Sequence, residues 1–496
     1  MKAKVNTSIW STCLTSLALI SDHHFLTKPV EPEISLNHLS IDNILLNKQE
    51  YEIIRHEVIG LIIDTAVKFL PNIAFLKHSK PLESAYISAK TEVIPLSCLP
   101  YNENKYQDDV KILAWYQQLL DTIKKEAGAD AELKFVIGGD QLTRERLSEA
   151  MLLRFGNIDP QDRFSHIGRC VEFFHLGMNY LEKVIFGELW NVEGVVEKGN
   201  PRGQCERLTE DPKIMKAYEA DKDFVDNYLS ANIIEALMSF FGMDNRNDFP
   251  TKNLPPTSFD DDKAKETWKI YATEINDYIE LVLDNGQTIL IPVAVSEITY
   301  KQLKPDKVKD YAHYSLEVGL IFSYFLNLCK EPVREQFLPL LKMMMVQLRG
   351  HSINAKYPKE ILRMLVQQYS VMGLQESCQV FCASFVNLHW RKDGNVPADL
   401  VQEWSVKESK KHIKHMFSNK ENLTIEHTTS ALPSIHKIAS NFDVEVGTLV
   451  RAKRHKDKSY DDEICVIMED LREILPFTHK EGRSYETFKN IPKSLC

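Results

Sequence analysis

Asp140 is the residue in this sequence best placed to do chemistry. It follows a short apolar run and two glycines in the segment KFVIGGDQLTRERLSEA, residues 134–150. The run at 135–137 predicts a buried strand, and the charged stretch after Asp140 has the spacing of a helix. Asp140 would then lie at the carboxyl end of a strand, where α/β folds bind their ligands, and its carboxylate could hold a divalent cation. The alternative is a structural role, in which Asp140 or Thr143 caps the next helix.

Asp399 and Glu403 are a second pair of candidates, four residues apart in a predicted helix and therefore on one face. Nucleotidyl transferases of the ribonuclease-H-like kind collect carboxylates from distant parts of the chain around two metal ions roughly 3.5–4 Å apart. Asp140 and Glu403 fit the second and third acids of such a set, with Mg²⁺ or Mn²⁺ as the cofactor if the site is catalytic. The alternative is a capping Asp140 and a solvated face that carries Asp399 and Glu403.

His175 lies in an apolar segment, RCVEFFHLGMNYL at residues 169–181. The segment predicts either a strand that runs into a helix or one buried helix. A lone histidine in such a run is commonly a hydrogen-bonded core side chain. The other interpretation makes His175 a catalytic group beside the metal site, and the residues leave both open.

Two basic clusters could contact nucleic-acid phosphates. The first follows the acid pair on the same predicted helix and consists of Lys407, Lys410, Lys411 and Lys414. The second contains Arg451, Lys453 and Arg454. Such runs are also typical of solvated helix faces and loops. The predicted partners are therefore DNA or other proteins, and no stretch is long and apolar enough to predict a membrane span.

Composition narrows the class of protein. The chain has 496 residues, 44% of them hydrophobic, and a formal net charge of −10. These values fit a globular protein of about two to four structural units and do not suggest a dedicated nucleic-acid binder. Nine cysteines without paired spacing favour a reducing compartment, so we expect an intracellular protein, nuclear or cytoplasmic. The motifs GxxxxGK[ST], HExxH and GxSxG are absent, which argues against kinase-like, zincin and hydrolase classes.

Hydrophobic spacing predicts a chain that is mostly helical. Helices are expected at residues 50–70, 108–125, 143–155, 221–241, 263–283, 311–329, 333–348, 359–371, 375–389 and 461–475. We expect four regions. Residues 1–105 form a helical or extended region truncated at its start, 106–195 an α/β core, 196–392 a helical insertion, and 393–496 a helical segment whose basic clusters close onto the core.

Six segments, in order, resemble the domain of unknown function 6589 family, which occurs in transposon-like eukaryotic proteins. The most specific is GDQLTRER, within residues 138–150. The others are KQEYEIIRHEVIGLIIDTAVKFLPNIAFLKHS, KTEVIPLSCLPYNENKYQDDVKIL, FFHLGMNYLE, FVNLHWRKDGNVPADLVQEW and GRSYETF. The resemblance runs from about residue 40 to the carboxyl terminus.

The order of these motifs implies an α+β fold, predominantly α-helical, with a small ribonuclease-H-like mixed sheet core and a large all-helical insertion. In that fold Asp140 is the second metal-binding acid, Glu403 the third, and His175 lies on an adjoining strand. The family's first acid belongs to an Asp-Asn motif on a first strand. Asp42-Asn43 matches this motif in sequence, but it lies too far downstream to belong to that strand. Losing one carboxylate removes several kcal/mol of transition-state stabilisation by rough estimate.

The resemblance therefore implies a transposon-derived relative of transposases that is degenerate as an enzyme. If active, it would cleave or transfer DNA strands with two metal ions. The alternative is a non-catalytic, domesticated helical scaffold that binds nucleic acid or protein.

Overall fold

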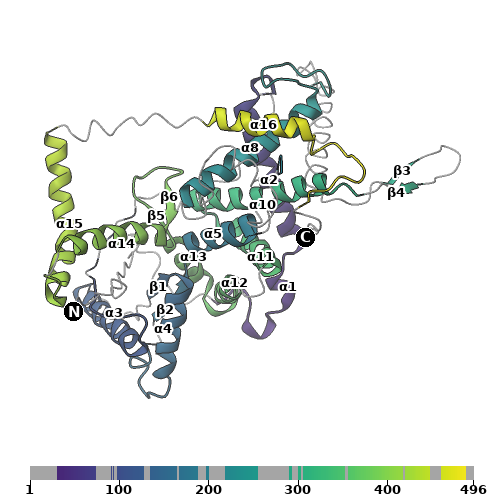
Figure 1. The fold of residues 1–496 in the computed structure, drawn as a ribbon. Coiled ribbons are helices and arrows are strands. Elements are labelled where there is room, and N and C mark those ends of the chain that lie inside the picture. Colours follow the sequence, from purple (N-terminus) through teal and green to yellow (C-terminus); the bar gives the residue numbers. More distant parts are fainter. Residues whose placement is uncertain are drawn as a thin grey trace, which may run out of the picture.

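The computed structural model describes residues 31–73, 91, 93, 96, 98–127, 135–164, 167–187, 197–199, 218–254, 290–292, 300–302, 305–351, 356–416, 419–446 and 460–486. Helices predominate in these ranges, and the strands form three two-stranded pairs (Figure 1). The predicted predominance of helix is confirmed. Two-stranded pairs do not by themselves form a ribonuclease-H-like sheet, so that part of the fold stays a prediction.

One parallel strand pair lies in a small α/β unit. Strand β1 (Phe135–Gly139) runs parallel to β2 (Ile167–Val171), from the pair Phe135↔Ile167 to the pair Gly139↔Val171. Helices α3 (Tyr106–Ala127) and α4 (Gln141–Leu153) pack beside it. Its own hydrophobic cluster includes Leu113, Tyr116, Ile137, Leu147 and Ile167. The predicted strand before Asp140 and the helices on either side of it are confirmed.

A larger hydrophobic cluster lies in the helical body. The body consists of α2 (Lys48–Phe69), α8 (Tyr218–Phe241), α10 (Lys307–Lys330), α11 (Arg334–His351), α12 (Tyr357–Val366) and α16 (Asp461–Ile474). The predicted helices in these segments are confirmed, and the helix predicted at 263–283 lies outside the described residues. All four predicted regions contribute to this cluster, the second of them through residues such as Phe173, Leu176 and Tyr180. The boundaries between the four regions stay a prediction.

Two predicted helices are shorter than expected. The helix predicted at 375–389 ends early, because α13 (Leu374–Ala383) is followed by strand β5 (Phe385–Asn387). All three residues of β5 are buried, so the strand lacks the alternation that separates strands from helices in a sequence. The helix predicted at 359–371 is α-helical only to Val366 and then becomes a π-helical segment, Gln367–Val371.

The segment around His175 is a strand followed by a helix. After β2 ends at Val171, helix α5 (Phe173–Tyr180) begins and continues as the π-helical segment Leu181–Phe186. His175 therefore lies in the first turn of α5, and its expected position on an adjoining strand is wrong. The continuous apolar run hid this boundary, because a buried strand and a buried helix look alike in sequence.

Helix α14 (Ala398–His415) joins the two parts of the structure. It starts directly after strand β6 (Asn395–Pro397), the antiparallel partner of β5, and contacts α5 and β1 before the chain reaches α15 (Asn422–Glu445) (Figure 1). The remaining regular elements are α1 (Ile41–Ile44) and the antiparallel pair β3 (Leu290–Pro292) and β4 (Tyr300–Gln302). Among the described residues, no helix combines the length and apolarity that a membrane crossing requires.

Candidate functional site

Asp140 caps helix α4 at the end of β1. Its Oδ1 accepts a hydrogen bond from the backbone N–H of Thr143 at 2.7 Å. This is the geometry of an N-cap aspartate, so the structural interpretation of Asp140 is confirmed. The carboxylate nevertheless lies at the carboxyl end of a parallel strand and is half-buried, as the metal-site interpretation also requires.

Asp399 is the most deeply placed acid of the site. Only 5% of it is exposed, so the expectation of a solvated Asp399 is wrong. Its Oδ1 accepts from the backbone N–H of Phe174 at 3.0 Å, and its Oδ2 accepts from the backbone N–H of His175 at 3.0 Å. These are first-turn donors of α5 that have no partner within the helix. Asp399 therefore caps α5 from a distant helix, where the N-cap residue Glu172 makes no side-chain cap.

His175 joins the two acids of α14. Its Nδ1 lies 2.9 Å from Oδ2 of Asp399, and its Nε2 lies 3.7 Å from Oε1 of Glu403. Burial lowers the pKa of His175, but the hydrogen bond to Asp399 and the charges of Asp399, Asp140 and Glu403 outweigh it, so the pKa is raised. Among the three predicted catalytic residues, Glu403 therefore lies beside His175, and Asp140 acts on His175 through its charge.

Glu172 is a buried acid that sequence reasoning missed. Burial, and then the charge of Asp399, raise its pKa well above the usual range for glutamate. The thiol of Cys170 donates to its Oε1 at 3.5 Å, and its Oε2 has no hydrogen-bond partner. A Cβ atom on Gly138 would lie 1.7 Å from Oε1, so this position of Glu172 requires glycine there. The Gly138-Gly139 pair was the one sequence signal that a side chain approaches β1 closely.

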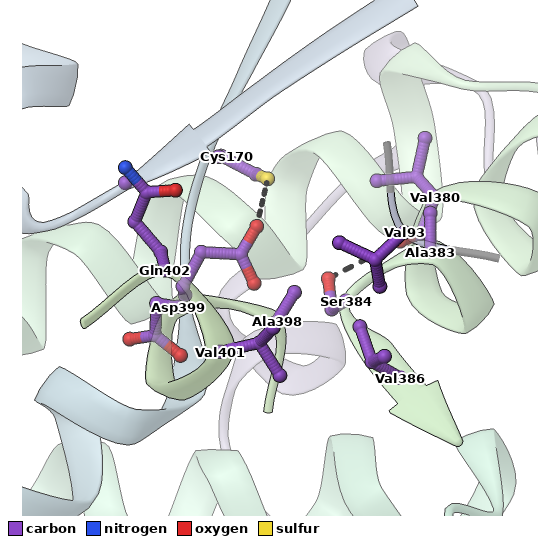
Figure 2. A pocket seen from close by; sticks show the side chains of 13 residues that line it. Val93, Cys170, Val380, Ala383, Ser384, Val386, Ala398, Asp399, Val401 and Gln402 are labelled. Carbon is purple, nitrogen blue, oxygen red and sulfur yellow. Dashed lines mark hydrogen bonds between the residues drawn. The ribbon is translucent and has the colours of Figure 1, made fainter. Parts of the chain in front are cut away.

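A small cavity of about 70 Å³ lies beside these acids. Cys170 and Asp399 lie on one side of it, and Val380, Ala383 and Val386 lie on the other (Figure 2). A cavity of this size holds on the order of a few water molecules. It is too small for a nucleotide, so a polymeric substrate would have to lie across the half-exposed side chains of His175 and Glu403.

Several carboxylate oxygens of the site already accept hydrogen bonds from backbone N–H groups. Both oxygens of Asp399 accept hydrogen bonds, and one oxygen of Asp140 is used by the helix cap. Among the described residues, no three His, Cys, Asp or Glu side chains are grouped so that they could hold a metal. The charges of Asp399, Asp140 and Glu403 all act on the imidazole of His175.

The candidate first acid lies in a helix. Asp42 is exposed on α1, and the Asn43 side chain accepts a hydrogen bond from the backbone N–H of Ser40 at 2.9 Å. Asp42-Asn43 therefore forms a local helix cap. It does not supply an acid at the end of a strand.

The first basic cluster lies on the same helix as the acids. Lys407, Lys410, Lys411 and Lys414 are all exposed on α14. The second cluster, with Arg451, Lys453 and Arg454, lies outside the described residues. The four exposed lysines therefore lie on the same helix, α14, as Asp399 and Glu403.

The model of a family of unknown function, DUF6589, matches residues 35–455. This range covers most of the chain, including β1, α5 and α14, and the protein belongs to that family. No curated protein and no solved structure matches the chain.

Proposed function

We propose that the protein is a transposon-derived, ribonuclease-H-like nucleic-acid-binding protein whose carboxylate site persists without strand cleavage. One observation carries the proposal. Acids from distant segments, Asp140 after β1 and Glu403 on α14, act on the same imidazole of His175. Convergence of strand-end and helix carboxylates is the arrangement that nucleotidyl transferases of this kind need.

Two features support the loss of catalysis: the position of the candidate first acid and the contacts that Asp399 already makes. Asp42, the candidate for the family's first acid, lies on α1 and not on a strand. Asp399 is engaged in capping α5 and in pairing with His175. A two-metal centre needs carboxylate oxygens that bridge the ions, and the two remaining acids supply too few for a second ion.

DNA cleavage assays in Mg²⁺ and in Mn²⁺ test this proposal. Asp140→Asn is the informative variant, because asparagine keeps the helix cap while removing the charge. We expect the wild type, Asp140→Asn and Glu403→Gln to be equal to the buffer background. Metal-dependent cleavage by the wild type that disappears in Asp140→Asn would overturn the loss of catalysis.

Binding is tested separately, with duplex DNA in EDTA. We expect Asp140→Asn to bind like the wild type. Replacing the four lysines of α14 with glutamine should weaken binding and reduce its salt dependence, because each phosphate contact adds to the salt slope. An unchanged affinity and salt slope in the quadruple variant would show that α14 is not the contact surface.

A further inference from the structure

The tip of the β5–β6 hairpin exposes a tryptophan next to an arginine and a lysine, with one exposed acid, Asp393, further along. The connecting segment reads LHWRKDG, residues 388–394. Trp390 is 75% exposed, and His389, Arg391 and Lys392 beside it are exposed as well. Tryptophan has one of the largest apolar side chains, so an exposed indole gives up much of the stabilisation that its burial would provide. This residue therefore contributes little to the core through its side chain.

The backbone of the tip is held firmly. The buried Asn387 donates from Nδ2 to the carbonyl of Arg391 at 2.7 Å, and its Oδ1 accepts from the N–H of Arg391 at 3.3 Å. Gly394 donates to the same Arg391 carbonyl at 3.2 Å. A Cβ on Gly394 would lie 2.9 Å from Cβ of Arg391, so the turn closes too tightly for another residue there.

The hairpin is anchored at its base as well. Thr91 donates its N–H to the carbonyl of Asn387 at 2.8 Å and accepts from the N–H of Asn387 at 3.0 Å through Oγ1. Asn395 donates from its side chain to the carbonyl of Lys330, at the end of α10, at 2.8 Å. The exposed tip is thus part of a fixed frame, and little further ordering is needed when a ligand binds it.

Trp390 is also strained. Its φ angle is 51°, in the left-handed region that favours glycine and disfavours bulky side chains. Strained residues of this kind persist where the surrounding structure holds them, and they gather at binding and catalytic sites. Because the indole is exposed, packing within the protein does not explain why a tryptophan occupies this position.

We propose that this tip binds single-stranded nucleic acid, with the indole of Trp390 stacked on an unpaired base. Aromatic faces stack on any base, and neighbouring cations neutralise the phosphates on either side. In a duplex the base faces are covered by their neighbours, so only an unpaired base offers its face to the indole. Trp and Arg also anchor protein interfaces, and we take nucleic acid as the ligand because the exposed lysines of the following helix α14 match its phosphates.

The position of the tip on the chain supports the same ligand. Strand β6 leads directly into α14, which carries Asp399, Glu403 and the exposed lysines. When a base of the nucleic acid stacks on Trp390, the phosphates of the same strand would contact the exposed lysines of α14, the next element of the chain. This inference rests on the proposed nucleic-acid binding and specifies the form of the ligand.

The test uses the full-length chain in EDTA with a labelled 20-nucleotide oligothymidylate and a duplex of the same length. We expect Trp390→Ala to weaken binding of the single strand by about tenfold, within the range measured for base–aromatic stacking. Trp390→Phe should retain most of the affinity. Phe249→Ala is the matched control, because Phe249 is also 75% exposed but lies far from the hairpin in sequence.

A second variant separates binding from folding. Trp390→Gly relieves the positive φ, so we expect it to unfold at the same or a higher temperature than the wild type while binding the single strand about as weakly as Trp390→Ala. If Trp390→Ala and Trp390→Gly bind the oligothymidylate like the wild type, the stacking site is wrong even if duplex binding through α14 stands. If the chain binds neither oligonucleotide, both proposals fail.

Discussion

Asp399 and His175 are joined twice, although 224 residues separate them in the sequence. Oδ2 of Asp399 accepts from the backbone N–H of His175 at 3.0 Å and lies 2.9 Å from the Nδ1 of its ring. One carboxylate therefore sets both the start of α5 and the orientation of the imidazole. This contact also ties α14 to the α/β unit, because α5 follows β2 directly.

Removing the Asp399 carboxylate should destabilise the protein. Asp399→Ala leaves the partly buried N–H groups of Phe174 and His175 without their acceptor, and we expect a loss of roughly 1–3 kcal/mol in the free energy of unfolding. Asp399→Asn keeps one acceptor oxygen and should lose less. Chemical denaturation measures both, with Asp162→Ala as an exposed control. Equal stabilities of Asp399→Ala and the control would contradict the capping role.

The helix cap at Asp140 predicts a difference between two substitutions. Asp140→Ala removes the acceptor for the N–H of Thr143 and should cost about 0.5–2 kcal/mol, whereas Asp140→Asn should cost a few tenths at most. Thermal unfolding of the two variants checks this. If both variants lost the same stability, the charge of Asp140 and not its hydrogen bond would be what stabilises α4.

The α/β unit around Asp140 was predictable because its signals are local. An apolar run, two glycines and a capping acid specify a strand, a tight turn and a helix within twenty residues. The role of Asp399 was not predictable in this way. Its partners are two N–H groups in another part of the chain, and in sequence it looked like one more acid on an amphipathic helix. Long-range caps leave no periodic signal.

The strand β5 and the helix α5 were mispredicted or left open for a related reason. Both are short and apolar, β5 is buried throughout and α5 buries one face, so strand and helix patterns look alike in their sequences. Phe173 and Phe385 illustrate this, since they stack on each other with ring centroids 5.2 Å apart and belong to different kinds of element. Their neighbours along the chain do not reveal which element each one forms.

This aromatic contact gives a further prediction. Phe173 also packs against Phe337 at 4.5 Å between ring centroids, and all three side chains are buried. Phe173→Ala should cost about 3–5 kcal/mol, because a phenyl-sized cavity opens where α5 meets β5. Phe173→Leu should cost clearly less. Unfolding in urea measures both, and a loss below 1 kcal/mol for Phe173→Ala would contradict the packing of α5 against β5.

Asp109 predicts a pH dependence of stability. Burial and the charge of Glu103 raise its pKa from 3.8 to about 7, and neither carboxylate oxygen has a hydrogen-bond partner. Between about pH 4 and pH 7 the unfolded state releases this proton before the native state does, so stability falls as the pH rises. Asp109→Asn removes the titration. Its stability relative to the wild type should therefore be greater at pH 8 than at pH 4.

The neighbouring Asp108 is the matched control with the opposite sign. A hydrogen bond from Lys111 lowers the pKa of Asp108, so its contribution to stability is present at neutral pH and is lost in acid. Asp108→Asn should be neutral or slightly destabilising at pH 8. If Asp109→Asn behaved like Asp108→Asn at both pH values, the buried, protonated state of Asp109 would be wrong.

The most direct test is the pKa of His175, because the central claim is that carboxylates from two distant segments, the end of β1 and helix α14, act on this ring. Nuclear magnetic resonance of histidine-labelled protein measures it, with His175→Asn to assign the signal. We predict a pKa above the ordinary 6.5 in the wild type and a lower value in both Asp140→Asn and Glu403→Gln. Glu408→Gln, which removes a carboxylate that pairs with His412 further along α14, should leave it unchanged. A pKa of His175 that stays the same in Asp140→Asn and Glu403→Gln would contradict the convergence of these acids.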